Sequence, residues 1–454
     1  MNDLSHLHPF STKGRAKQIE SKILDRLSTV GVIGLGYVGL PLAITIAKSG
    51  FNVIGFDVDA TKVNSLNAGT SHIDAVAGIA LSELISRNLF NASGDMRELA
   101  GCDVVCICVP TPLSKQREPD LSFVADSGRA VASQLRRDQL IILESTTYPG
   151  TTDEILKPIL EASGLVAGSD FFMGYSPERE DPGNKEFTTA SIPKVVSGDG
   201  MIAQQLVQAF YGTFIEKVVP VSSIKTAEVV KITENVFRAV NIALINELKV
   251  IYTAMGIDIW EVIEAAKTKP FGYMPFYPGP GLGGHCIPVD PFYLTWKSRE
   301  FELSTRFIEL AGEINQNMPR HVVARLEEAL DSKFSLAASQ AMVLVIGAAY
   351  KKNVPDVRES PSLKIMELMS KKMAGLAYHD PFVSSLSIGH DGAGLSYESV
   401  ELTVERIAAS DAVLILTDHD CIDYGNIASH ARLVVDTRNA LRSRNITCKR
   451  LVSA

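Results

Sequence analysis

The sequence predicts an α/β protein with two doubly wound parallel-sheet domains, joined by a helical domain with a long central helix. Three observations support this fold class. Apolar strands alternate with helical segments early in the chain, a stretch free of glycine and proline covers residues 223–255, and a second strand-and-turn pattern starts near Ala341. Alternating strands and helices indicate parallel sheets with crossover connections. We expect an extension over residues 1–28 and domains over 29–215, 216–330 and 335–454.

Length, composition and charge limit the class of protein to which the chain can belong. The chain has 454 residues, 46% hydrophobic residues and a net charge of −8, which fits a globular protein of about three domains. An acidic balance argues against nucleic acid as the main partner, because phosphate neutralisation needs a basic surface. Residues 1–27 lack the apolar core of a signal peptide, and no apolar run is long enough for a bilayer. We therefore expect a cytoplasmic protein without membrane contact.

The first domain is predicted to start with a strand at residues 30–33, after a polar lead that ends in a short helix at 17–26. A helix at 40–49 and a strand at 51–56 follow, and further strands are expected at 104–109 and 140–143.

A glycine motif stands between the first strand and the first helix. Gly34 allows a tight turn, Gly36 lets the backbone approach a diphosphate, and Gly39 lets the helix pack on the strand. Asp57, at the end of the second strand, suits a ribose hydroxyl and repels a 2′-phosphate, which favours NAD over NADP. The alternative is a glycine turn without a ligand. The predicted cofactor contacts here are Gly34, Gly36, Tyr37, Val38, Gly39 and Asp57.

Two later strands end in polar loops, and ligands of such sheets lie beyond the carboxyl ends of the strands. Thr111 lies in the loop after one strand and Thr146 in the loop after the next, so both are candidates for the cofactor site. For each loop alone, an ordinary strand-ending turn is the simpler interpretation.

The stretch over residues 223–255 predicts a helix with Lys231, Asn235 and Arg238 on one face, because their offsets are four and three. This face is either a solvated polar stripe or a cationic and amide surface for an anionic, oxygen-rich substrate. Helical pattern resumes over 301–330.

Between these helices, residues 270–291 are too rich in proline and glycine for a regular helix. Cys286 follows the glycines of this segment. A nearby cation such as Lys231 would make its thiol nucleophilic, while His285 is either structural or substrate-binding. For the other five cysteines we expect buried, inert side chains, and cysteine spacing predicts no metal site.

The third domain repeats the α/β pattern, with strands predicted at 342–346, 413–416 and 433–435. It lacks the three glycines, so its ligand is bound differently. Lys351, Lys352 and Arg358 follow its first strand, where they suit a phosphate or form a charged surface turn.

Seven motifs in order make the chain resemble the UDP-glucose/UDP-N-acetylhexosamine 6-dehydrogenase family: GLGYVGLPLA, VPTPL, ESTTYPGTT, YSPERE, KITENVFRAVNIALINE, PGPGLGGHCIPVDPFYL and AYKKNVPDVRESPS. The resemblance implies an NAD-binding Rossmann domain, a central helical domain and a Rossmann-like UDP-sugar domain. It also implies a homo-oligomer, and a four-electron oxidation of the sugar C6 alcohol for polysaccharide synthesis.

By the same resemblance, Cys286 is the nucleophile, Lys231 and Asn235 stabilise oxyanions, and Asp290 poises the cysteine or the lysine. Thr146 and Glu178 position water and shuttle protons, and Glu180 or Asp181 fills a second acidic role. Arg358 is assigned to the cofactor. The residues assigned to the substrate are Arg179, Lys231, Asn235, Arg238, Gly283, Tyr350 and Lys351.

The loop over residues 269–277 resembles the UDP-N-acetylglucosamine branch, because the arginine usual in the UDP-glucose branch is missing between Arg238 and Arg299. UDP-N-acetylmannosamine, UDP-N-acetylgalactosamine and UDP-glucose are the alternative substrates. More remote alternatives are a two-electron hydroxyacid-type dehydrogenase, which needs no Cys286, and a non-catalytic nucleotide-sugar-binding protein.

Overall fold

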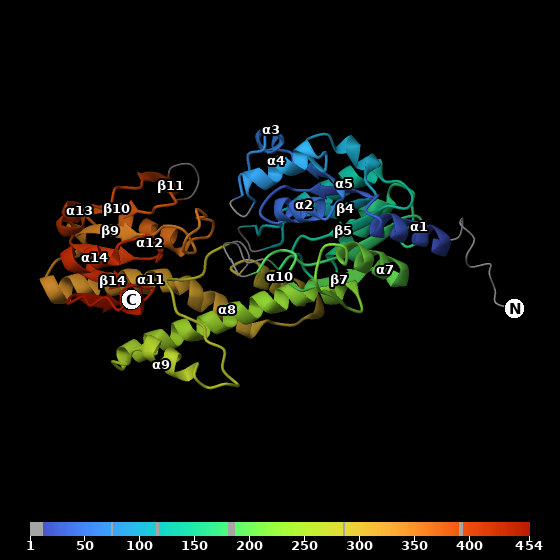
Figure 1. Ribbon diagram of the computed structural model, residues 1–454. Helices are drawn as coiled ribbons and strands as arrows, with labels where there is room; N and C mark the ends of the chain where they lie inside the picture. The colour runs from blue at the N-terminus through green and yellow to red at the C-terminus, as the bar shows by residue number, and fades with distance from the viewer. Residues whose placement is uncertain (1–11, 74–75, 115–117, 180–186, 285–286, 390–393) are drawn as a thin grey trace. The chain divides into compact units, whose positions relative to one another are not determined.

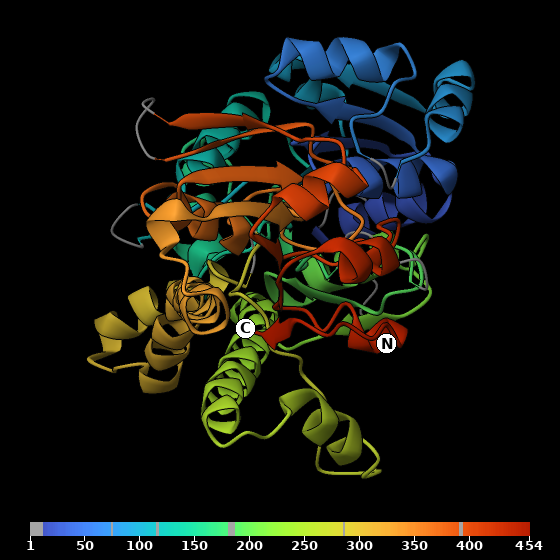
Figure 2. The same cartoon turned by 90° about the vertical axis from the view of Figure 1, so that its left-hand side faces the viewer.

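The computed structural model describes residues 12–73, 76–114, 118–179, 187–284, 287–389 and 394–454 (Figure 1). The chain divides into two compact units. The first extends to Glu234 and includes Trp296–Glu302, and the second comprises Asn235–Thr295 and Leu303–Ala454. Figures 1 and 2 show α8 (Ile224–Ala254) as one unbroken helix, and it contributes residues to both units.

The first unit contains an eight-stranded sheet in the order β3-β2-β1-β4-β5-β6-β7-β8. Neighbouring strands are parallel except β6 and β7. The strand order reverses between β1 and β4, and in open α/β sheets ligands bind at such a reversal. The strands are β1 (Thr29–Ile33), β2 (Asn52–Phe56), β3 (Phe90–Ser93), β4 (Val104–Ile107), β5 (Leu140–Leu143), β6 (Phe172–Tyr175), β7 (Lys194–Gly198) and β8 (Val218–Pro220).

Helices cover both faces of this sheet, because successive strand residues point to opposite sides. Cys106 packs into a core with α1, α2, α4 and α7, whereas Val105 and Ile107 pack into one with α5 and α6. The helices are α1 (Thr12–Leu24), α2 (Gly39–Lys48), α3 (Ala60–Asn67), α4 (Gly78–Ser86), α5 (Ser122–Gln134), α6 (Lys157–Glu161) and α7 (Gly200–Tyr211).

The second unit contains a five-stranded parallel sheet in the order β10-β9-β13-β14-β15, and a separate antiparallel pair, β11 and β12. Its strands are β9 (Met342–Ile346), β10 (Gly375–His379), β11 (Ser385–Ile388), β12 (Leu395–Glu398), β13 (Ala412–Ile415), β14 (Val434–Asp436) and β15 (Leu451–Ser453). Besides its parts of α8 and of α10 (Asp290–Ser298), its helices are α9 (Ile259–Ala266), α11 (Arg306–Phe334), α12 (Pro361–Ser370), α13 (Val404–Ala409) and α14 (Tyr424–His430).

The α/β fold class is confirmed, and most predicted elements lie where the sequence placed them. The helix expected over 223–255 is α8, and the Ser223 hydroxyl accepts a hydrogen bond from the Thr226 amide at its start. The helix expected over 301–330 is shifted, since α11 begins at Arg306 and ends at Phe334. The segment predicted to be irregular over 270–291 ends two residues earlier, because α10 begins at Asp290. Pro291 does not prevent this, since proline is tolerated in the first turn of a helix. In the described part of the chain, none of the helices has the length and apolarity needed to cross a membrane.

Candidate active site

The turn between β1 and α2 requires glycine at two of its three motif positions. Gly34 has a φ of +90°, and a Cβ there would lie 2.6 Å from the carbonyl oxygen of Cys108. A Cβ on Gly39 would lie 1.8 Å from the carbonyl oxygen of Gly34. At Gly36 a Cβ would meet nothing within 4 Å, so the second glycine faces open space. This arrangement fits a diphosphate that approaches the backbone at the start of a helix.

Asp57 lies at the end of β2, beside this turn. Its carboxylate accepts hydrogen bonds from the amides of Leu35 (3.1 Å) and Asp59 (3.0 Å), and the side chain is 8% exposed. Lys62 Nζ lies 3.6 Å from Asp57 Oδ2, a partner that the sequence did not suggest. Of the other predicted contacts, Tyr37 is exposed and Val38 is half-buried at the start of α2.

The loops after β4 and β5 are tied together at the predicted cofactor residues. Thr111 Oγ1 donates a 2.6 Å hydrogen bond to the carbonyl oxygen of Thr146. Ser145 Oγ donates a 2.7 Å bond to the carbonyl oxygen of Val109. The structure therefore brings Thr111 and Thr146 together at one edge of the sheet.

Two predicted catalytic residues meet in the first unit. Lys231 on α8 and Glu178, which follows β6, are both buried, and Lys231 Nζ lies 3.3 Å from Glu178 Oε2. Next to them, the Arg179 guanidinium lies 2.6 Å from Glu234 Oε1 and donates to the Pro193 carbonyl at 2.7 Å. The lysine and the arginine each have a carboxylate close by.

A second predicted pair meets in the second unit. Asn235, one helical turn beyond Lys231, donates a 2.6 Å hydrogen bond to Asp290 at the start of α10. Both side chains are buried. The expected stripe along α8 is therefore not a solvated face at Lys231 and Asn235, whereas Arg238 is exposed.

The glycine-rich loop packs closely on the segment after β9. A Cβ on Gly283 would lie 2.6 Å from Tyr350 Cβ, and the Gly284 amide donates to the Arg358 carbonyl at 3.1 Å. Arg358 pairs with Asp356 at 2.7 Å, and Lys351 is half-buried. Gly283, Tyr350 and Arg358 are thus brought together. Cys286, His285, Glu180 and Asp181 lie outside the described residues.

The remaining cysteines only partly match the expectation. Cys102, Cys106 and Cys108 are buried, and burial raises the pKa of the Cys102 thiol to about 12. Cys421 is exposed and Cys448 is half-buried, so the prediction of a buried side chain was wrong for these two. Cys421 lies in the turn between β13 and α14, where the chain returns to the surface.

The sequence did not predict two buried polar contacts of the first unit. Glu228 on α8 accepts hydrogen bonds from the Gly150 amide at 2.5 Å and the Thr152 amide at 2.9 Å. Lys194 Nζ lies 2.6 Å from Glu144 Oε2, at the end of β5. Lys194 at the start of an apolar strand could have indicated the contact with Glu144. Nothing in the sequence pattern indicated the contact of Glu228.

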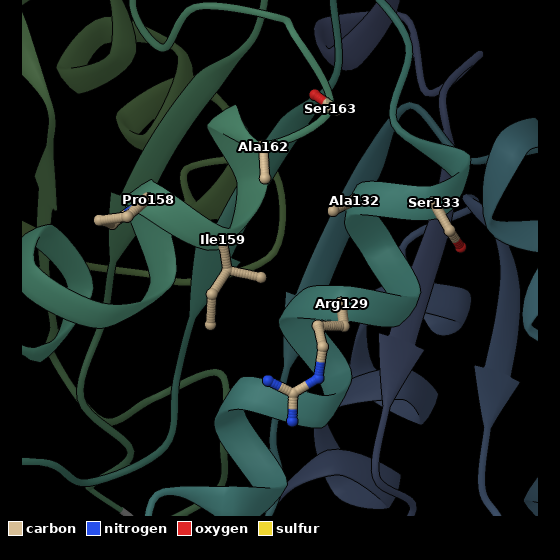
Figure 3. Close-up of a pocket in the computed structure, with 7 residues that line it drawn as sticks. All are labelled: Arg129, Ala132, Ser133, Pro158, Ile159, Ala162 and Ser163. Atoms are coloured by element: carbon tan, nitrogen blue, oxygen red, sulfur yellow. The ribbon is translucent and has the colours of Figure 1, made fainter.

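A hollow on the surface of the first unit lies between α5 and α6 (Figure 3). Figure 3 shows Ile159 and Arg129 facing it from opposite helices. Its lining residues are Arg129, Ala132, Ser133, Pro158, Ile159, Ala162 and Ser163, and the predicted site residues are not among them.

The glycine turn after β1, with Asp57 at the end of β2, is typical of a domain that binds a dinucleotide such as NAD. The chain belongs to the UDP-glucose/GDP-mannose dehydrogenase family. The family's NAD binding domain matches residues 28–215, its central domain residues 225–317 and its UDP binding domain residues 344–443. The protein is thus an NAD-dependent UDP-sugar dehydrogenase with a UDP-sugar as its substrate.

Relatives that bear the name of a UDP-sugar dehydrogenase align over most of the chain. UDP-N-acetyl-D-glucosamine 6-dehydrogenase of Pseudomonas aeruginosa is 38% identical over 392 residues, 86% of this chain and 90% of the relative. UDP-N-acetyl-D-mannosamine dehydrogenase of Pyrococcus horikoshii is 35% identical over 421 residues, 91% and 96% of the two chains. The solved structure of UDP-D-ManNAc dehydrogenase from Pyrococcus horikoshii superposes with a TM-score of 0.84 at 32% identity, covering 94% of this chain and 98% of that one.

Proposed function

We propose that this protein oxidises the C6 hydroxymethyl group of UDP-N-acetylglucosamine to the carboxylate of the uronic acid, with two NAD and one water consumed. The observation that carries this proposal is the placement of Lys231 and Asn235 on successive turns of α8, both buried and each beside a carboxylate. Such groups can stabilise oxygen that gains negative charge during an alcohol oxidation.

The residues of the first unit hold the cofactor. When bound there, NAD would supply the hydride acceptor for each of the two oxidations. The turn from Gly34 to Gly39 receives the diphosphate, Asp57 accepts from the ribose, and Thr111 and Thr146 border the cofactor at the strand ends.

Side chains of the protein take part directly in the conversion of the aldehyde to the carboxylate. The Cys286 thiolate adds to the aldehyde carbon, and the carbonyl oxygen takes a proton from Lys231. The hydroxyl of the resulting thiohemiacetal returns its proton to Lys231, and the second oxidation converts the thiohemiacetal to a thioester. Water positioned by Thr146 then attacks, Glu178 takes its proton, and the carbon–sulfur bond breaks to restore the thiolate. In this scheme Asp290 holds Asn235 in place, and Arg358 contacts the cofactor.

Two observations favour the N-acetylglucosamine substrate. The loop over 269–277 lacks the arginine usual in the UDP-glucose branch, and the 38% identical relative bears the name UDP-N-acetyl-D-glucosamine 6-dehydrogenase. UDP-N-acetylmannosamine is the second candidate, because a relative with that activity aligns over 91% of the chain. Arg179, Arg238 and Lys351 contribute positive charge for the diphosphate, and Gly283 and Tyr350 border the substrate.

The wider setting follows from the same assignment. We expect a cytoplasmic homo-oligomer that supplies uronic acids for a polysaccharide. The proposed domains are 29–215 for NAD, 216–330 for the central helical part and 335–454 for the UDP-sugar.

The stoichiometry of the reaction tests the mechanism. With a panel of UDP-sugars, we expect turnover to be fastest with UDP-N-acetylglucosamine and to release two NADH per sugar consumed, measured by absorbance and by product analysis. One NADH per sugar, with an aldehyde product, would contradict the thioester route.

Replacing the nucleophile should separate the two oxidations. Cys286→Ala should abolish acid formation, because the aldehyde then has no thiolate to form a thioester. NAD binding, followed by fluorescence titration, should be retained. Cys421→Ala is the matched control, since it removes an exposed cysteine from the second unit. Acid formation by Cys286→Ala at the wild-type rate would exclude Cys286 as the nucleophile.

A further inference from the structure

The two α/β units build the end of their first strand in the same way. In the first unit the Gly34 amide donates to the Phe56 carbonyl at 2.8 Å, and the glycine has a φ of +90°. In the second unit the Gly347 amide donates to the His379 carbonyl at 2.9 Å, with a φ of +85°. In both cases the glycine follows the first strand and bonds to the last residue of the neighbouring strand.

An aspartate completes the turn in each unit. Asp57 follows β2, and its Oδ2 accepts from the amide of Leu35, the residue after the glycine, at 3.1 Å. Asp380 follows β10, and its Oδ2 accepts from the amide of Ala348, again the residue after the glycine, at 2.7 Å. Asp380 is therefore the counterpart of the residue that suits a ribose in the first unit.

The two carboxylates differ in what surrounds them. Asp57 keeps some exposure, whereas the side chains of Asp380 and His419 are fully buried. His419 Nε2 lies 3.0 Å from Asp380 Oδ2, and Asp380 Oδ1 accepts from the amides of Phe382 and Val383 at 2.9 and 3.2 Å. In both units each carboxylate oxygen accepts from a backbone amide, but only Asp380 also has an imidazole against it and no exposed side-chain surface, so it is not accessible to a ribose.

The other nitrogen of His419 reaches the loop after β9. Its Nδ1 accepts a 2.9 Å hydrogen bond from the amide of Asn353, which fixes the tautomer with the proton on Nε2, facing Asp380. Asn353 also donates to Asp420 at 2.6 Å, and the Asp420 amide donates back to Asn353 Oδ1 at 3.0 Å. These bonds hold Asn353, two residues beyond Lys351, in its left-handed conformation, with a φ of 62°.

We propose that His419 is a positioning residue for the UDP-sugar, because the hydrogen bonds that link Asp380, His419 and Asn353 fix the loop that carries Lys351. Asp57 suits a ribose in the first unit, whereas its counterpart Asp380 orients His419 in the second unit. The inference rests on the proposed function for the role of Lys351, and the support lies inside the segment that matches the UDP binding domain.

Three variants test the support. Asparagine at 419 can replace Nδ1 as the acceptor for the Asn353 amide, whereas glutamine can replace Nε2 as the donor to Asp380. We expect His419→Ala and His419→Gln to raise the Kd of UDP, measured by calorimetry, by about tenfold. His419→Asn should bind UDP close to the wild-type affinity. His379→Ala, which removes a half-buried imidazole from β10, is the matched control and should leave UDP binding unchanged.

Kinetics separate positioning from general damage. We expect the KM for the UDP-sugar to rise in His419→Ala while kcat and the KM for NAD stay within about twofold of wild type. Equal UDP affinities of His419→Ala and wild type would overturn the inference. Equal UDP affinities of His419→Asn and His419→Gln would overturn it as well. The comparison of these two variants decides the case if His419→Ala does not fold. A wild-type protein that binds UDP but oxidises no UDP-sugar would instead contradict the proposed function.

Discussion

Gly36 and Gly39 differ in what an added methyl group would meet. Gly36 faces open space, while Gly39 lies against the Gly34 carbonyl. We expect Gly36→Ala to keep the wild-type melting temperature but to raise the Kd of NAD by about tenfold, because the methyl group occupies the approach of the diphosphate. Gly39→Ala should destabilise the fold by about 2 kcal/mol or more, because helix and turn must move apart.

Thermal melting and NAD titration of the two variants check this prediction. Unchanged NAD affinity in a folded Gly36→Ala protein would show that the diphosphate does not pass this glycine. A Gly39→Ala protein as stable as wild type would show that the turn adapts more easily than the contact distance indicates.

At this scale the sequence predicted residue types better than partners. Lys231, Asn235 and Asp290 were all singled out, but the bond from Asn235 joins residues 55 positions apart, and only the folded chain brings them together. Asp290 was expected to poise the cysteine or the lysine, and the structure pairs it with Asn235. Glu178 was placed by resemblance alone, and its contact with Lys231 emerges only from the structure.

Among the elements, α8 is tied to the loop after β5 through a buried carboxylate. Glu228 accepts from the amides of Gly150 and Thr152 and from the Thr152 hydroxyl, at 2.5, 2.9 and 2.7 Å. The same loop carries Thr146, and Lys231 lies three residues further along α8. Glu228 thereby fixes the spacing between two elements that carry predicted catalytic residues.

This contact predicts a pH dependence of stability. Burial raises the pKa of Glu228 from 4.5 to about 7, although hydrogen bonds from Gly150 and Thr152 favour the charged form. Between these values the folded protein holds a proton that the unfolded chain releases, so the free energy of unfolding falls as pH rises. The contribution of this residue falls by about 3 kcal/mol across the window and is constant above it.

Urea unfolding at about pH 5 and about pH 7.5 measures this contribution. In Glu228→Gln the decrease should be smaller than in wild type, because glutamine does not titrate. Glu247→Gln, which changes an exposed residue of the same helix, should keep the wild-type decrease. The same pH slope in Glu228→Gln and wild type would rule out Glu228 as its source.

The elements that could be predicted from the sequence are those with long or uninterrupted patterns. Strands β5 and β9 and helix α8 were placed within one residue at each end. Strand β4 was drawn two residues too long, because Cys108 and Val109 continue its apolar run after the ladder has ended. The short strands at the edges, such as β8 and β15, have three residues each, too few to show a period.

At the scale of the whole molecule, the two α/β units share a turn but match different domains of the family, one described as NAD binding and the other as UDP binding. The sequence indicated this, because the segment after β9 has only the first of the three glycines, with Ala348 and Ala349 next to Gly347. The structure gives a physical reason why the second unit does not bind a ribose as the first does, since His419 contacts the equivalent acid, Asp380, and both side chains are fully buried. The repeat of the acid itself could not be predicted, because no short motif surrounds it.

This difference predicts one NAD per chain. Calorimetric titration of the protein with NAD should give a stoichiometry of one. Among the described residues, the first unit combines open space at the second glycine with an acid that keeps some exposure, whereas the side chain of Asp380 in the second unit is fully buried. Gly36→Ala should weaken this single phase, whereas His419→Ala should leave its stoichiometry at one, because freeing Asp380 does not supply the missing glycines. A second NAD per chain in the wild type, surviving in Gly36→Ala, would mean that the second unit has kept a dinucleotide site.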